Sequence, residues 1–216
     1  FRLAATSWNG TSLVDLVLVR HGVTDWNEQR RLIGRVDLGL NERGRAQARS
    51  VAEALGVLPV AAVYSSPQLR SRQTAEPIAR THGLGVEVEA RLDEVWLGRW
   101  QGRTVTELRG DPDLERYLKD PTCICDAIEP AAEVQERIVA VVEELQGRHG
   151  EEKLVLVSHA DPLRLLLTHH LSMELGSFRR LAVGNGSVSL LRFTSRRVCL
   201  LALNWQAGAF LGVLRS

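Results

Sequence analysis

The stretch LVLVRHGVTDWN, residues 16–27, decides how this chain is organised. Four apolar residues lead directly into Arg20, His21 and Gly22. A near-continuous apolar run of this kind is typical of a central strand in a parallel sheet, which is buried on both faces. The strand therefore brings a guanidinium and an imidazole to its own end, where a glycine lets the chain turn.

The composition fits an ordinary globular domain. The chain has 216 residues, of which 44% are hydrophobic and 25% charged, enough to bury a sizeable core. Lys and Arg number 27 against 26 Asp and Glu, so no basic surface argues for a nucleic-acid partner. We expect an N-terminal tail at 1–12 and one domain at 13–216.

Membrane and disulfide signals are also weak. No apolar run reaches the length that spans a bilayer, so no membrane partner is expected. The start of the chain lacks the apolar core of a secretory signal. The three cysteines neither form a disulfide framework nor complete a metal site. These features predict a protein of the reducing cytoplasm.

Two further apolar strands end in polar residues. The run 60–64 is followed by two serines and then Arg70, and the run 154–157 by Ser158 and His159. Helical patterns separate the strands, which favours parallel pairing. We therefore predict an α/β fold, a mostly parallel central sheet with helices on both faces.

The same pattern predicts a shared site. The carboxyl ends of parallel strands lie along one edge of the sheet, where ligands bind. Arg20, His21, Arg70 and His159 are expected to meet there. Arginine binds phosphate with a planar fork of donors, and a neutral histidine is a competent nucleophile. The predicted pocket therefore suits a phosphate dianion.

Helix starts are expected to strengthen this pocket. Ser66 with Pro67 is predicted to begin one helix, and Asp161 with Pro162 another. Free N–H groups and the positive end of the helix dipole favour an anion.

Other segments are predicted from their patterns. A long helix is expected from Pro130 to about Gln146, and TVTELRGDPDLERYL is interpreted as two short helical pieces. SVSLLRFTSRRVCLLALNW, near the end, predicts two strands with a turn at Ser195 and Arg196.

The opening motif resembles the signature of the histidine phosphatase superfamily, whose members include cofactor-dependent phosphoglycerate mutases. Four later segments resemble family segments in the same order. They are RLIGRVDLGLNERGRAQA, VYSSPQLRSRQTA, LDEVWLGRWQG and LVLVSHADPLR. The resemblance implies that Arg70 is the second phosphate-binding arginine, Glu94 the acidic proton donor and His159 the second histidine.

The resemblance implies a mechanism without metal or cofactor. His21 attacks phosphorus to form phosphohistidine, and Glu94 protonates the leaving oxygen before activating water. Fixed donors replace Mg²⁺ in stabilising the transition state. The residues expected to hold the phosphate oxygens are Arg20, Arg70, His159 and Asn27.

Alternatives remain for several of these residues. Arg72 competes with Arg70, although two positions apart on a helix they point to different sides. Asp93 competes with Glu94 for the role of acid. Asn27 is as well suited to capping a turn as to binding phosphate.

Neighbouring residues leave alternatives of their own. Trp96 and Trp100 are expected to line the entrance or to pack, and their rings to favour a protonated Glu94. Glu133 lies either near the pocket or in solvent, and Arg164 either near the phosphate or against a local carboxylate.

The predicted activity is hydrolysis of a small-molecule phosphomonoester, with a homodimer left open as the assembly. A cofactor-dependent phosphoglycerate mutase is the alternative, although the segment 102–130 is short and lacks a substrate-binding run of Lys and Arg. A non-catalytic binding protein of the same fold is less consistent with the retained site residues. Ile33, where many relatives carry a polar residue, makes the substrate side more apolar.

Overall fold

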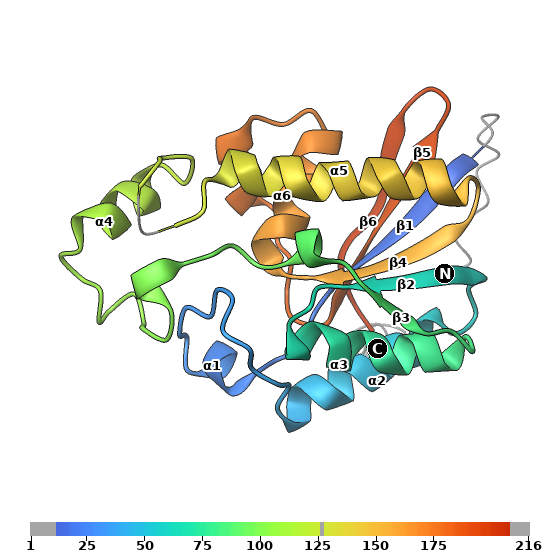
Figure 1. Ribbon diagram of the computed structural model, residues 1–216, viewed down its shortest axis with the longest axis horizontal. Helices are drawn as coiled ribbons and strands as arrows, with labels where there is room; N and C mark the ends of the chain where they lie inside the picture. Colours follow the sequence, from blue (N-terminus) through green and yellow to red (C-terminus); the bar gives the residue numbers. More distant parts are fainter. Residues whose placement is uncertain (1–11, 126–127, 208–216) are drawn as a thin grey trace, which may run out of the picture.

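The computed structural model describes residues 12–125 and 128–207 (Figure 1). Its centre is one six-stranded sheet of order β3-β2-β4-β1-β5-β6. The strands are β1 (Ser12–Arg20), β2 (Val60–Ser65), β3 (Val86–Val88), β4 (Lys153–Ser158), β5 (Ser187–Thr194) and β6 (Val198–Gln206). Strands β1 to β4 run parallel to one another, whereas β5 pairs antiparallel with both of its neighbours, β1 and β6. The predicted mostly parallel sheet is confirmed.

Helices lie on both faces of this sheet, as predicted. They are α1 (Asp25–Glu28), α2 (Glu42–Leu55), α3 (Leu69–Thr81), α4 (Pro112–Lys119), α5 (Ala131–His149) and α6 (Ala160–His170). Short 3₁₀ turns are η1 (Ala90–Leu92), η2 (Gly98–Trp100) and η3 (Leu175–Arg180). In Figure 1, α2 and α3 cover one face while α5 and α6 cover the other.

Strand β1 contributes to both cores, which explains its continuous apolar run. Leu16 and Leu18 pack with residues of α5 and α6. Val17 and Val19, pointing the opposite way, pack with residues of α2 and α3. Because both faces are covered, the strand is apolar from Leu16 to Val19, and the one buried carboxylate before this run, Asp15, is paired with Lys153 and Arg192.

A third apolar cluster lies beyond the sheet. It joins Trp100, Leu108 and Tyr117 to Leu165 of α6 and to Phe178. Helix α4 lies at this end of the molecule, away from the strands (Figure 1). This layer covers the edge of the sheet where β1, β2 and β4 end.

Some predicted boundaries are wrong. Only the second of the two expected helical pieces is a helix, because Thr104 forms a β-bridge with Arg31 and residues 105–110 form turns that end at Gly110 with a positive φ of 87°. Asp111 then caps α4 with its side chain. Helix α5 runs three residues past Gln146, and the predicted hairpin of β5 and β6 is confirmed.

The expected tail and domain boundary stays a prediction. Strand β1 begins at Ser12, and residues 1–11 lie outside the described residues. Within the described ranges, no helix is long and apolar enough to cross a membrane.

Candidate active site

The ends of β1, β2 and β4 meet at one edge of the sheet, as predicted. Arg20 pairs with Ser158 across β1 and β4, and Ser65 pairs with Val157 across β2 and β4. A cavity of about 170 Å³ opens at this edge. It is lined by Arg20, His21, Asn27, Arg31, Leu32, Ile33, Gly34, Arg70, Glu94, Val95, Leu97, Ala160 and Asp161. Five of the six predicted site residues are among them, and the sixth, His159, is fully buried beside them.

The two nitrogens of His21 have different partners. Its Nδ1 lies 2.7 Å from the carbonyl oxygen of Gly22, and the Nε of Arg70 lies 3.3 Å from its Nε2. Arginine only donates hydrogen bonds, so Nε2 is the acceptor and Nδ1 carries the proton. The lone pair of His21 therefore lies on Nε2, beside the cavity.

The turn after His21 needs its glycine. A Cβ at Gly22 would lie 2.5 Å from the carbonyl oxygen of Gly44, much closer than such atoms approach. The amide of Gly22 also donates to Thr74 Oγ1 at 3.0 Å. Close packing against α2 and α3 thus fixes the carbonyl that accepts the His21 proton.

His21 is held in its neutral form. Burial lowers the pKa of its imidazole well below the usual range, and the positive charges of Arg70 and Arg20 lower it further. The side chain is only 2% exposed. A neutral imidazole whose Nε2 carries no proton is a competent nucleophile.

Arg70 is the arginine that the structure places in the cavity. It is fully buried, and its terminal nitrogens donate to the carbonyls of Val36 and Gly34, both at 2.8 Å. Arg72 is half-buried, turns back to the carbonyl of Pro67 and does not line the cavity. The geometry therefore separates the two candidates.

Arg20 is the last residue of β1. Its Nη1 donates to the carbonyl of Val183 at 2.7 Å, and its buried Nε has no partner among the described residues. Burial lowers the pKa of the guanidinium to about 10, against the opposing charge of Glu94. The group is still a cation at neutral pH, so the site favours an anion.

Glu94 has the properties of a general acid. Burial, followed by the negative charge of Asp161, raises the pKa of its carboxyl to about 7. Its Oε1 accepts the amide of Val95 at 2.9 Å. A carboxyl with this pKa can exchange a proton near neutral pH.

The predicted contribution of the tryptophan rings to Glu94 is not seen. Trp96 is 43% exposed and Trp100 packs in the third apolar cluster, and neither lines the cavity. Its apolar lining beside Glu94 comes instead from Val95 and Leu97.

The competing carboxylates are directed elsewhere. Asp93 accepts hydrogen bonds from Ser66, Gln68 and the amide of Glu94. Glu133 is exposed at the start of α5 and does not line the cavity.

His159 lies behind the nucleophile. The two imidazole rings are 5.1 Å apart in an edge-to-face arrangement, and His159 Nε2 lies 2.8 Å from Ser66 Oγ. Its buried Nδ1 has no hydrogen-bond partner among the described residues and lies 4.0 Å from Glu94 Oε2. Because Ser66 donates its hydroxyl proton to Asp93, Nε2 of His159 donates to Ser66. Burial lowers the pKa of this imidazole well below its usual range, so the ring is neutral and its lone pair lies on Nδ1.

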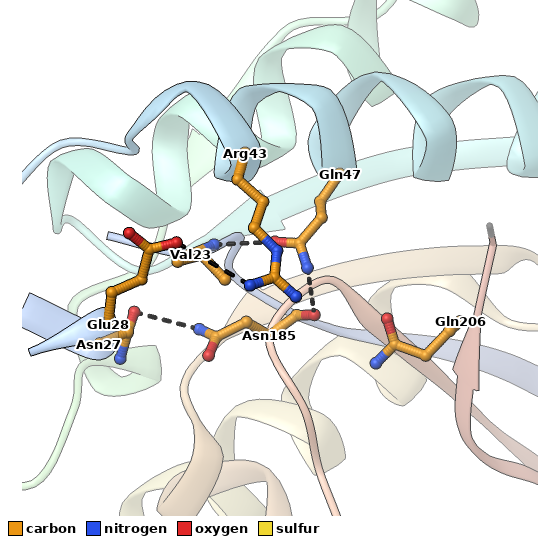
Figure 2. A pocket seen from close by; sticks show the side chains of 7 residues that line it. All are labelled: Val23, Asn27, Glu28, Arg43, Gln47, Asn185 and Gln206. Atoms are coloured by element: carbon orange, nitrogen blue, oxygen red, sulfur yellow. Dashed lines mark hydrogen bonds and ion pairs between the residues drawn. The ribbon is translucent and has the colours of Figure 1, made fainter. Parts of the chain in front are cut away.

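Asn27 fulfils the capping role, and its amide nitrogen stays available. Its Oδ1 accepts the backbone amide of Thr24 at 3.0 Å, which completes a capping box at α1. The amide nitrogen of Asn27 lies on the opposite side of the group (Figure 2). Because Asn27 lines the cavity, the two predicted roles are compatible.

One expected anion contact is absent. Helix α3 begins at Leu69, not at Ser66, and the amides of Leu69 and Arg70 already donate to Asp37 Oδ1 and to the carbonyl of Leu38. The predicted contribution of this helix start is therefore wrong. The start of α6 does reach the cavity, through Ala160 and Asp161.

Asp161 is a cavity residue that sequence reasoning missed as part of the site. Its carboxylate pairs with Arg164 at 2.9 Å, which confirms the second of the two alternatives for that arginine, pairing with a local carboxylate. The position of Asp161 two residues after His159 was the available signal. Within residues 12–125 and 128–207, no three His, Cys, Asp or Glu side chains are grouped as metal ligands would be.

Sequence comparison places this site among known enzymes. A family model described as the histidine phosphatase superfamily, branch 1, matches residues 16–206. Phosphoserine phosphatase 1 of Hydrogenobacter thermophilus is 34% identical over 195 residues, which cover 89% of this chain and 92% of that protein. A probable phosphoglycerate mutase of Escherichia coli is 31% identical over 180 residues, covering 82% and 84%.

Solved structures agree. A mycobacterial glucosyl-3-phosphoglycerate phosphatase in complex with VO₃ superimposes with a TM-score of 0.81 at 31% identity, covering 88% of this chain and 98% of that one.

Proposed function

Because this chain belongs to the histidine phosphatase superfamily, we propose that it hydrolyses small phosphomonoesters through a phosphohistidine on His21. The observation that carries this proposal is the environment of His21. The imidazole is neutral, its proton is on Nδ1, and its lone pair on Nε2 faces a cavity that contains two arginines.

The first step transfers the phosphoryl group. The Nε2 lone pair of His21 forms a bond to phosphorus as the bond from phosphorus to the ester oxygen breaks. Glu94, protonated near neutral pH, gives its proton to that oxygen, so an alcohol leaves rather than an alkoxide.

The second step restores the enzyme. Glu94, now a carboxylate, takes a proton from water as the water oxygen attacks phosphorus. The bond from Nε2 to phosphorus breaks, inorganic phosphate is released, and His21 returns to its neutral form. One carboxyl thus serves both steps, which requires a pKa close to the working pH.

Fixed positive and polar groups stabilise the transferred phosphoryl group. Arg20 and Arg70 provide the charge, and Asn27 Nδ2 provides a further contact to oxygen. His159 Nδ1 provides another once the charge of the bound dianion has raised the pKa of the imidazole, so that this nitrogen is protonated. These groups are already in position and need little reorganisation during the reaction. We therefore propose that the reaction needs neither a metal ion nor a cofactor.

The substrate is proposed to be a small phosphorylated molecule. Two relatives are named as phosphatases of phosphoserine and of glucosyl-3-phosphoglycerate, and the cavity of about 170 Å³ suits a compact leaving group. No nucleic-acid or membrane partner is proposed. Since the three cysteines are free thiols, we place the enzyme in the reducing cytoplasm.

The test is a panel of phosphomonoesters in the presence of EDTA. Release of phosphate from at least one of them, with inhibition by vanadate, is expected. Loss of activity on chelation that one divalent ion restores would contradict the proposal.

The similarity to a probable mutase calls for one further assay. 3-Phosphoglycerate with a bisphosphoglycerate primer should yield phosphate and no 2-phosphoglycerate. Isomerisation faster than hydrolysis would favour the mutase.

A further inference from the structure

The turn between η3 and β5, residues 183–186, packs against the backbone of the residues that form the phosphate site. The amide of Gly186 lies 3.1 Å from the carbonyl oxygens of both Arg20 and His21. The carbonyl of Val183 accepts the guanidinium of Arg20. The turn therefore contacts the last residue of β1 and the residue that follows it.

Asn185, within this turn, points its side chain at the site. Its Nδ2 donates to the carbonyls of His21 and Gly22 at 3.2 and 3.4 Å, and to Asn27 Oδ1 at 3.2 Å. All three acceptors are oxygens, so the opposite orientation of the amide would place oxygen against oxygen. Figure 2 shows this side chain directed at Asn27 across a surface pocket.

The hydrogen bond from Asn185 fixes which end of the Asn27 side-chain amide faces the cavity. Asn27 Oδ1 is held by the amide of Thr24 on one side and by Asn185 on the other. Its Nδ2 is left to face a bound phosphate. A reversed amide would present an oxygen to the anion and repel it.

The contact with Gly22 supports the nucleophile. The carbonyl oxygen of Gly22 accepts both the Nδ1 proton of His21 and one N–H of Asn185. If this carbonyl were displaced, the imidazole of His21 could rotate, and the tautomer with its proton on Nδ1 would no longer be favoured.

The turn is itself anchored to α2. Gln47 donates through Nε2 to the carbonyl of Asn185 at 3.1 Å and accepts through Oε1 the amide of Val23 at 2.9 Å (Figure 2). The backbone of Asn185 is thus fixed by α2, while its side chain contacts the site. A residue that orients other side chains needs such an anchor.

We propose that Asn185 is a positioning residue of the phosphate site, which turns the donor end of the Asn27 amide toward phosphate and holds the Gly22 carbonyl that orients His21. This inference rests on the proposed function. It adds a residue from the other end of the chain that contacts neither substrate nor the reacting atoms.

The test is a double-mutant cycle read by vanadate inhibition. Asn185→Ala should raise the inhibition constant about 3- to 10-fold, the scale of one hydrogen bond to a group facing an anion. In an Asn27→Ala background, the same change should have a smaller effect, because the amide that it orients is gone and only its contacts with the carbonyls of His21 and Gly22 remain to be lost. An equal effect in both backgrounds would overturn the proposal, since a purely structural role would be additive.

A second variant and a control complete the experiment. Asn185→Asp keeps the shape but replaces the donor with a carboxylate, which attracts Nδ2 of Asn27 away from the cavity, so its effect should exceed that of Asn185→Ala. If Asn185→Ala does not fold, the cycle is run with Asn185→Asp. Arg43→Ala, on the opposite rim of the pocket, removes a 71% exposed side chain paired only loosely with Glu28 at 3.9 Å and should leave vanadate inhibition unchanged.

The wild-type protein separates two kinds of failure. If it forms no phosphoenzyme and binds no vanadate, the proposed function is wrong and this inference falls with it. If the wild type does both, and the Asn185→Asp variant has the same turnover and the same vanadate inhibition constant as the wild type, only the role of Asn185 is wrong.

Discussion

The phosphate site and the layer that covers it are built by different means. His21, Arg70 and His159 are polar groups buried at the edge of the sheet, each held by a backbone carbonyl or a hydroxyl. The covering layer relies on apolar packing, as between Trp100 and Tyr117, whose rings are 5.7 Å apart. Displacing a hydrogen-bonded group therefore disrupts the first region, whereas the second accepts substitutions of similar volume.

This difference assigns different tasks to the two regions. The sheet edge presents the same donors to any phosphate. The layer contributes Leu97 to the cavity. We infer that the sheet edge determines the chemistry and that the layer influences which leaving group fits.

The largest effect is expected at the nucleophile. His21→Ala removes the only proposed phosphoryl acceptor and should lower kcat by at least ~10⁴-fold without unfolding the protein. Steady-state kinetics with circular dichroism measures both. Near-wild-type turnover by the folded variant would contradict the assignment of the chemistry to the sheet edge.

The next effect is expected at the acid. Glu94→Gln cannot protonate the leaving oxygen, so formation of the phosphoenzyme from an alkyl phosphate should slow ~10²- to 10⁴-fold. An aryl phosphate such as p-nitrophenyl phosphate has a stable leaving group and should suffer less. Rapid-quench measurement isolates this step, since loss of the base slows dephosphorylation for both substrates alike. Equal slowing of the first step would exclude Glu94 as the acid.

A smaller change is expected from Asp161→Asn. Its negative charge helps to raise the pKa of Glu94 to about 7, so removing it should lower that pKa. The acid must be protonated in the first step, and activity falls as pH rises through its pKa. The alkaline limb of the single-turnover profile should therefore move to lower pH. An unmoved limb would leave burial as the sole cause of the raised pKa.

The smallest effect on phosphate chemistry is expected in the covering layer. Leu97→Ala enlarges the cavity on the side formed by the covering layer. KM for esters with different leaving groups should change several-fold, whereas the inhibition constant of vanadate should stay within about 2-fold. A change in vanadate affinity as large as the change in KM would mean that the layer also shapes the phosphate site.

The two regions also differ in how well the sequence predicts them. The apolar runs, each followed by polar residues, predict the parallel sheet and the meeting of Arg20, His21 and Arg70, because strand ends along one edge leave few alternatives. The residues from 104 to 110 follow no such rule. Their turns depend on side-chain bonds such as that from the amide of Thr104 to Glu107, which a helical pattern does not reveal.

Within the site itself, sequence reasoning failed where the contacts cross between distant segments. The helix start expected at Ser66 is displaced because Asp37, from another loop, binds the amide of Leu69. Asn185 lies far along the chain from Asn27, and no motif linked them. Local patterns identify the groups that react, whereas their orientation depends on packing that only the folded chain defines.

The central claim is that His21 carries the phosphoryl group on Nε2, and trapping that intermediate tests it most directly. The enzyme would be mixed with a rapidly turned-over phosphomonoester in EDTA and quenched in base. Peptide mass spectrometry locates the phosphoryl group, and ³¹P NMR identifies the ring nitrogen. The account predicts phosphohistidine at His21, on Nε2, because Nδ1 donates to the carbonyl of Gly22. Phosphate on Nδ1, on another residue, or on none while hydrolysis continues would contradict it.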